Sequence, residues 1–179
     1  MNITKLNISG CYLLESKKFQ DQRGSFVKTY HADMFHDAGI NFNFAEEFYS
    51  TSHKDVIRGM HFQIPPADHD KFVFCAKGAV IDVFLDIRKT SETYGKYLSV
   101  ELTGDNAKAL YLPKGIAHGF LSLQNDSLMV YKTTSVHTPV CDSGIKWNSF
   151  GFEWPVTAPI ISERDNKFIE LNNFDSPFK

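Results

Sequence analysis

Short runs of apolar and β-branched residues recur along the chain, each broken by a turn signal. In the run 79–86, Val80, Val83 and Leu85 interleave with two aspartates, roughly the period of a half-buried strand. Turn-forming groups that contain Gly, Pro, Asn or Asp separate the runs. The predicted strands are 11–15, 25–30, 44–52, 56–62, 71–76, 79–86, 96–102, 108–112, 119–123 and 128–134. Many short strands at this spacing predict a β-sandwich, jelly roll or barrel.

Helix is predicted only near the two ends of the chain. Residues 31–38 precede Gly39, a common helix terminator, and are long enough for about two turns. Ser162 can cap a short helix that runs into Asp165. The expected fold class is therefore all-β, with short helical segments near the N-terminus and at the C-terminal end.

Composition narrows the class of protein. The 179 residues predict one domain, 1–179, and 42% hydrophobic with 22% charged residues is ordinary for a globular protein. A net charge of −2 argues against non-specific binding to nucleic acid. Three widely spaced cysteines without a CxxC favour the reducing cytoplasm. No signal peptide is recognisable, and no apolar run approaches the ~20 residues of a membrane helix.

Two histidines inside strand-like runs suggest proton transfer. A single strand histidine is more often structural, but His61 and Gln63 are two residues apart and should share a strand face. Arg58 would lie on the opposite face of a regular strand, so it must reach round an end or a bulge at Gly59.

The second histidine, His118, lies between Gly115 and Gly119. Glycines there allow close approach of a ligand, but a turn histidine bonded to backbone is an equal alternative. A later run adds the phenol of Tyr131. Histidine titrates near neutrality and tyrosine near pH ~10, so one can take a proton from carbon while the other returns one. The pattern indicates a proton-transfer enzyme on a β scaffold.

Metal binding is the competing use of these histidines. Many metal-dependent jelly-roll enzymes use a His-x-His pair, whereas this chain has Gln63 at the second position, a poor ligand for a transition metal. His69 has no partner at ligand spacing, and Lys71 would place positive charge where a metal would lie. We expect no metal. Nucleophile elbows and phosphate-binding glycine-rich loops are also missing from the sequence.

Collinear motifs extend this picture over nearly the whole chain. They lie at 19–26, 58–63, 86–95, 112–120, 131–132, 144–148 and 161–165. In this order, between about residue 11 and residue 165, they resemble the dTDP-4-dehydrorhamnose 3,5-epimerase family. The resemblance implies a cupin-type jelly roll without metal or other cofactor. It also implies a cytoplasmic homodimer that acts on a nucleotide-linked 4-keto-6-deoxy sugar in polysaccharide synthesis (capsule or lipopolysaccharide) or antibiotic sugar synthesis.

Catalytic roles follow from the same resemblance. His61 would abstract the proton next to the ketone, with Asp165 holding its ring, and Tyr131 would reprotonate the opposite face. Lys71 would stabilise the enolate oxygen, with His118 nearby. By itself, Asp165 is an unremarkable acidic residue in the first turn of a helix.

Binding roles are implied for five further residues. Arg23 and Arg58 would hold the diphosphate, because a forked guanidinium suits phosphate oxygens. Phe19 and Arg23 would reach the site from the partner subunit. Gln63 would face the substrate, and Asp142 matches an acidic position near the nucleotide, although an acidic turn residue is an equal alternative.

Some positions depart from the family pattern. Residues 46–48 are Glu-Glu-Phe where the family usually has Gln-x-Asn, residues 136–137 are Val-His where it commonly has two tyrosines, and Lys28 replaces an acidic residue. The base (TDP, GDP or CDP), a hexose or heptose sugar, and inversion at C3, C5 or both therefore stay open. Alternative functions are a 3,4-ketoisomerase of nucleotide ketosugars and a non-catalytic cupin that binds sugar nucleotides. A binder, however, needs no matched acid and base.

Overall fold

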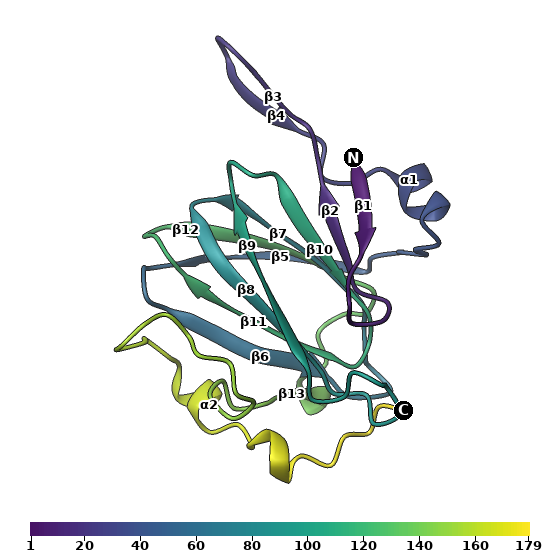
Figure 1. Cartoon of the computed structure of the whole chain (residues 1–179), viewed down its shortest axis with the longest axis vertical. Coiled ribbons are helices and arrows are strands. Elements are labelled where there is room, and N and C mark those ends of the chain that lie inside the picture. Colours follow the sequence, from purple (N-terminus) through teal and green to yellow (C-terminus); the bar gives the residue numbers. More distant parts are fainter.

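Two antiparallel β-sheets face one another in the computed structural model, which describes residues 1–179 (Figure 1). In spatial order, the six-stranded sheet contains β1 (Asn2–Lys5), β2 (Tyr12–Glu15), β10 (Lys108–Leu112), β7 (Lys71–Lys77), β12 (Ser127–Thr133) and β5 (Glu46–Ser52). The five-stranded sheet contains β13 (Asp142–Gly144), β6 (Ile57–Gln63), β11 (Ile116–Ser122), β8 (Ala79–Asp86) and β9 (Tyr97–Thr103). The predicted all-β jelly roll is confirmed.

The core lies between the two sheets. Phe84 and Phe120 of the five-stranded sheet are buried against Leu110 and Met129 of the six-stranded sheet. Complete burial of such a side chain stabilises the folded chain by about 1.5–3 kcal/mol. The inward positions of the alternating strands therefore hold the sheets together and leave the ends of the sandwich to form cavities.

The C-terminal tail crosses the outer face of the five-stranded sheet, along β6 and β13 (Figure 1). Trp154 and Phe178 of the tail belong to a second buried cluster with Met60 and Leu85 of the sheet. The tail contains α2 (Glu163–Asn166) and η2 (Leu171–Asn173). As predicted, Ser162 caps α2, its hydroxyl oxygen accepting a hydrogen bond from the Asp165 amide at 3.1 Å. This packing carries the start of α2 to β6.

A two-stranded hairpin projects away from the sandwich (Figure 1). It consists of β3 (Lys18–Asp21) and β4 (Gly24–Val27), and its Phe19 and Phe26 side chains are 52% and 61% exposed. The predicted N-terminal helix is α1 (Ala32–Asp37), which buries Phe35 and ends before Gly39, a residue with φ +76°. A 3₁₀ turn, η1 (Pro139–Cys141), precedes β13, and neither α-helix is long enough to cross a bilayer.

Each of the ten predicted strands corresponds to a strand of the structure, whereas β1, β3 and β13 were not predicted. Those three are short, and neither β1 nor β3 has a buried residue to give the sequence an apolar period. One boundary changes the picture of the site. β11 begins at Ile116, so His118 lies inside a strand, and the alternative of a turn histidine is wrong.

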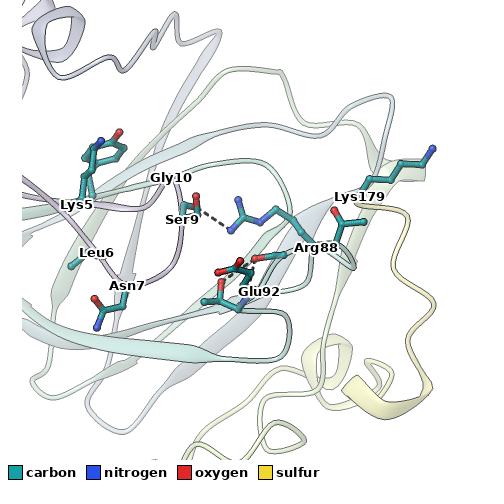
Figure 2. A pocket seen from close by; sticks show the side chains of 12 residues that line it. Lys5, Leu6, Asn7, Ser9, Gly10, Arg88, Glu92 and Lys179 are labelled. Atoms are coloured by element: carbon teal, nitrogen blue, oxygen red, sulfur yellow. Dashed lines mark hydrogen bonds between the residues drawn. The ribbon is translucent and has the colours of Figure 1, made fainter.

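A large polar cavity of about 760 Å³ opens between the β1–β2 loop and the loop after β8 (Figure 2). Arg88 points toward Ser9 there and donates to its carbonyl oxygen at 3.0 Å. The same guanidinium donates two hydrogen bonds to the Asp86 carboxylate, which also accepts from Ser91 and Thr93. These bonds tie the two loops together, and no predicted site residue lines this cavity.

Replacing Gly144 by Ala should destabilise the fold where the tail meets the sheet. The new methyl group would lie 2.3 Å from the Phe168 ring, and overpacking of this kind costs about 1–3 kcal/mol. Urea unfolding measures the loss. The double variant Gly144→Ala/Phe168→Leu should lose less than the sum of the single changes. Additive losses would show that this contact does not limit the packing.

Candidate active site

A β-bulge in β6 turns Arg58 toward the same cavity as His61. Along β6 and β11, His61 pairs with His118 and Arg58 pairs with Phe120. The three residue steps from Arg58 to His61 in β6 therefore lie opposite only two residue steps in β11. Gly59 has φ +132°, and a Cβ there would lie 2.5 Å from the Cα of Gly119. The bulge expected at Gly59 is therefore confirmed, and only glycine fits it.

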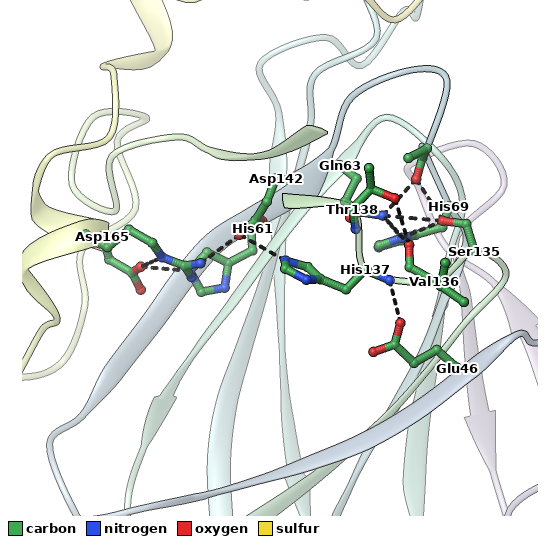
Figure 3. A network of polar contacts seen from close by, with 12 residues as sticks. Glu46, His61, Gln63, His69, Ser135, Val136, His137, Thr138, Asp142 and Asp165 are labelled. Atoms are coloured by element: carbon green, nitrogen blue, oxygen red, sulfur yellow. Dashed lines mark hydrogen bonds and ion pairs between the residues drawn. The ribbon is translucent and has the colours of Figure 1, made fainter. Parts of the chain in front are cut away.

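The ring of His61 lies against the carboxylate of Asp165 (Figure 3). Nε2 of His61 and Oδ1 of Asp165 are 2.9 Å apart, and Oδ2 accepts a hydrogen bond from the Gly59 amide at 3.0 Å. Burial alone would raise the pKa of Asp165, but its close contact with His61, the Gly59 amide and the positive charge of Arg164 lower it to about 2. The bulge thus delivers a backbone donor to the residue that orients the histidine.

His61 is neutral in this setting. Burial lowers its pKa, and the positive charges of Lys71 and Arg164 act in the same direction, whereas Asp165 opposes them. The edge of the Phe168 ring packs 5.7 Å from the imidazole, centroid to centroid. A partly buried, neutral and oriented imidazole is suited to act as a base.

Lys71 begins β7 and places its ammonium group beside the backbone of His61. Its Nζ donates to the His61 carbonyl oxygen at 2.7 Å, and burial lowers its pKa to about 8. His118 lies 2.7 Å, Nε2 to Oδ2, from Asp82, and both side chains are buried. Burial raises the pKa of Asp82. The cavity wall therefore holds two groups, Lys71 and His118, that could meet developing negative charge on an oxygen.

Tyr131 lies on β12 of the six-stranded sheet, and its ring packs edge-on near His118, with the ring centroids 6.0 Å apart. Its ring stacks on Phe48 at 4.8 Å and 12°, and its hydroxyl is 3.4 Å from the Ser50 Oγ. Burial raises the pKa of Tyr131 above its ordinary value of 10. The phenol therefore keeps its proton at neutral pH and can donate it to a stronger base.

Two adjoining cavities of about 230 and 210 Å³ share Phe48, His61, Lys71 and Arg164 as lining residues. The first cavity is completed by residues that include Arg58, His118 and Tyr131, and the second by residues that include Glu46, Gln63, His137 and Asp142. His61 and His118 come from the five-stranded sheet, whereas Lys71 and Tyr131 come from the six-stranded sheet. The predicted base and acid thus belong to opposite walls of one continuous space.

The second cavity is lined by a polar network (Figure 3). Gln63 accepts a hydrogen bond from the Thr138 amide at 2.6 Å and donates to the Ala67 carbonyl at 2.8 Å, so its amide holds two loops together. His137 lies between Asp142 and Glu46, with its Nε2 3.6 Å from Asp142 Oδ2 and its amide donating to Glu46. The substrate-facing roles of Gln63 and Asp142 stay predictions.

Phe19 and Arg23 are not part of this site within one chain. They line a separate cavity on the projecting hairpin, where Arg23 pairs with Asp21. Sequence reasoning missed Arg164 and Asp82, which contact His61 and His118. The available signals were the position of Arg164 next to Asp165 and a carboxylate in the middle of the apolar run 79–86.

Comparison with known proteins agrees with this geometry. The family model described as dTDP-4-dehydrorhamnose 3,5-epimerase matches residues 5–173. The chain belongs to the dTDP-4-dehydrorhamnose 3,5-epimerase family. The predicted family, cupin-type fold and isomerase class are thereby confirmed.

Relatives in this epimerase family are similar over nearly their full length. The Escherichia coli K12 dTDP-4-dehydrorhamnose 3,5-epimerase is 39% identical over 96% of this chain and 95% of its own. A dTDP-4-dehydrorhamnose 3-epimerase from Streptomyces niveus is 33% identical over 96% and 84%. The Legionella pneumophila 3,5-epimerase, solved with dTDP-4-keto-L-rhamnose, is 31% identical over 99% and 98%, with a TM-score of 0.93. Relatives named as 3-epimerases and relatives named as 3,5-epimerases thus both resemble this chain.

Replacing Asp165 by Asn should remove a pH-dependent part of the free energy of unfolding. The pKa of Asp165 is about 2 in the folded chain against an ordinary 3.8. Its carboxylate therefore stabilises the fold above about pH 4 by about 2 kcal/mol, and this contribution is lost as the pH falls toward about 2. Urea unfolding between about pH 6 and about pH 3 measures the difference between wild type and variant, which should shrink as the pH falls. A constant difference would contradict the assignment.

Proposed function

We propose that this protein inverts C3, C5 or both of a nucleotide-linked 4-keto-6-deoxy sugar, without a cofactor. The observation that carries the proposal is the placement of His61 and Tyr131 on opposite sheets around one cavity that Lys71 also lines. Epimerisation requires a proton to leave one face of a carbon and another to arrive on the opposite face, and this pair meets that requirement.

The chemistry follows from the charges of the three groups. His61 takes the proton next to the ketone, and the electrons of the C–H bond move onto the carbonyl oxygen. Lys71, still largely protonated at neutral pH with a pKa of about 8, stabilises the enolate in a space where a charge interaction is stronger than in water. Tyr131 then gives its proton to the opposite face of the same carbon. Solvent returns a proton to Tyr131 and removes one from His61.

The proposed substrates include sugars linked to more than one kind of nucleotide. The names of the relatives above point to dTDP-linked sugars, and Arg58 in the cavity supports a diphosphate. Glu46 and His137, which depart from the family pattern, line the second cavity, so GDP- and CDP-linked sugars, heptoses included, are part of the proposed class. We place the reaction in the cytoplasm, in deoxysugar synthesis for capsule, lipopolysaccharide or a related product.

We also propose a homodimer in which each subunit completes the site of the other. The hairpin that carries Phe19 and Arg23 projects from its own subunit and exposes the rings of Phe19 and Phe26, whose centroids are 6.5 Å apart. Exposed apolar side chains on a projecting element are typical of a contact surface. A partner hairpin would add an arginine to the diphosphate end of the cavity.

Incubation with nucleotide-4-keto-6-deoxy sugars in D₂O should place deuterium at C3, C5 or both, as read by mass spectrometry and NMR. His61→Asn should lower the exchange at least ~100-fold, whereas Tyr131→Phe should lower product formation more than exchange. His36→Asn and Tyr111→Phe, which lie outside both cavities, serve as controls. Absence of exchange with TDP-, GDP- and CDP-linked substrates would favour the binding protein, and a shifted carbonyl would favour the ketoisomerase.

Mixed subunits should restore activity if the hairpin serves the partner's site. His61→Asn and Arg23→Gln are each expected to be poorly active alone. After unfolding and refolding together, half of the dimers are mixed, and one site of each mixed dimer has both His61 and Arg23. The mixture should therefore regain about a quarter of the wild-type rate. No gain, with mixed dimers verified by native mass spectrometry, would mean that Arg23 acts within its own subunit or not at all.

A further inference from the structure

Two residues compete for the same ring nitrogen of His61. Nε2 lies 2.9 Å from Oδ1 of Asp165 and also 2.9 Å from Nη2 of Arg164. A guanidinium nitrogen only donates hydrogen bonds and a carboxylate oxygen only accepts them. The nitrogen of a neutral imidazole either carries a hydrogen or presents a lone pair. The two contacts therefore describe two mutually exclusive arrangements of the base.

Only one of the two arrangements leaves His61 with a ring nitrogen that can accept a proton. When Nε2 carries the hydrogen and donates to Asp165, the other ring nitrogen, Nδ1, has a free lone pair. When Arg164 donates to Nε2, the hydrogen of the neutral ring is on Nδ1, and neither nitrogen can accept a proton from carbon. The second arrangement leaves Asp165 satisfied, because Nε of Arg164 donates to the same Oδ1 at 3.2 Å.

Arg164 has the freedom to leave this position. Its side chain is 55% exposed and lines both cavities. Its remaining nitrogen, Nη1, donates to Asp142 at 2.8 Å, and its guanidinium lies over the Phe168 ring at 5.6 Å. Asp142 has a second partner available in His137, whose Nε2 lies 3.6 Å from Oδ2 of Asp142. A diphosphate entering the cavity offers a guanidinium more negative charge than one shared carboxylate does.

We propose that Arg164 is a substrate-operated gate on the base. In the free protein it caps Nε2 of His61, and the diphosphate of the substrate draws the guanidinium away. One proton then leaves Nδ1 for water and one arrives at Nε2, so the charge of the ring is unchanged. Nε2–H now donates to Asp165, and Nδ1 becomes the base. The proposal rests on the proposed function, since it assigns the diphosphate part of that substrate a role in activation.

Nitrogen NMR of the imidazole rings tests the gate directly. The signals of His61 in ¹⁵N-labelled protein are those that disappear in His61→Asn. In the free wild type, Nδ1 should be protonated and Nε2 not. Saturation with TDP, GDP or CDP, whichever is seen to bind by its effect on backbone amide signals, should move the hydrogen to Nε2. Arg164→Gln should show Nε2–H with and without the nucleotide.

Lys167→Gln is the matched control, because it removes one positive charge from the end of the same short helix, and the side chain of Lys167 forms an ion pair with Glu163 alone. It should behave like wild type. The gate is wrong if the free wild type already has Nε2–H, if a bound nucleotide leaves the tautomer unchanged, or if Arg164→Gln matches the control. With substrate, Arg164→Gln should raise KM about tenfold or more, as loss of a charged hydrogen bond does, and change kcat less than KM. A larger change in kcat than in KM would also contradict the gate.

The NMR result does not depend on turnover. A tautomer switch without deuterium exchange into any sugar would keep the gate and remove the proposed epimerase reaction. Deuterium exchange without a tautomer switch would support the epimerase reaction and contradict the gate.

Discussion

The contact between His61 and Asp165 joins parts of the chain that are 104 residues apart in sequence. Asp165 reaches β6 only because the tail packs its aromatic side chains on the outer face of the five-stranded sheet. The same carboxylate accepts the amide of Gly59 and so holds the bulge that turns Arg58 into the cavity. One buried carboxylate therefore fixes the orientation of the imidazole and the local backbone at once. Tail packing, which in many sandwiches would serve stability alone, is here a condition for the geometry of the site.

The two-sheet architecture explains why opposite faces of a substrate can be served. Strand pairing sets His118 beside His61 in the five-stranded sheet, and it sets the strands of Lys71 and Tyr131 side by side in the six-stranded sheet. Facing sheets lie about 10 Å apart, which leaves room for a sugar ring between their side chains where large apolar residues are missing. A single strand, with side chains alternating between faces, cannot place two groups on either side of a ligand.

Sequence reasoning succeeded where a local pattern carries the information. Alternating apolar residues found the ten main strands, Gly39 and Ser162 marked the helix ends, and Gly59 marked the bulge. It failed at β1 and β3, whose residues are largely exposed and so carry no apolar period. The strand around His118 begins earlier than predicted because Ile116 and Ala117 are buried against β8. Arg164 was not predicted to belong to the site, because the sequence around it does not indicate that the tail packs against β6.

Residues proposed to act in proton transfer and residues that depart from the family pattern occupy different parts of the structure. Lys71, His118 and Tyr131 lie within or at the start of strands flanked by neighbours on both sides, and all three are buried. Glu46 lies on β5, the outer strand of its sheet, and His137 lies in the exposed loop after β12. An exposed edge or loop accepts a new side chain at little cost in free energy, whereas a buried charged residue is held by partners that must change with it. Substitutions at the edge strand and the loop can therefore change the group that the fold recognises while the residues proposed for proton transfer stay in place.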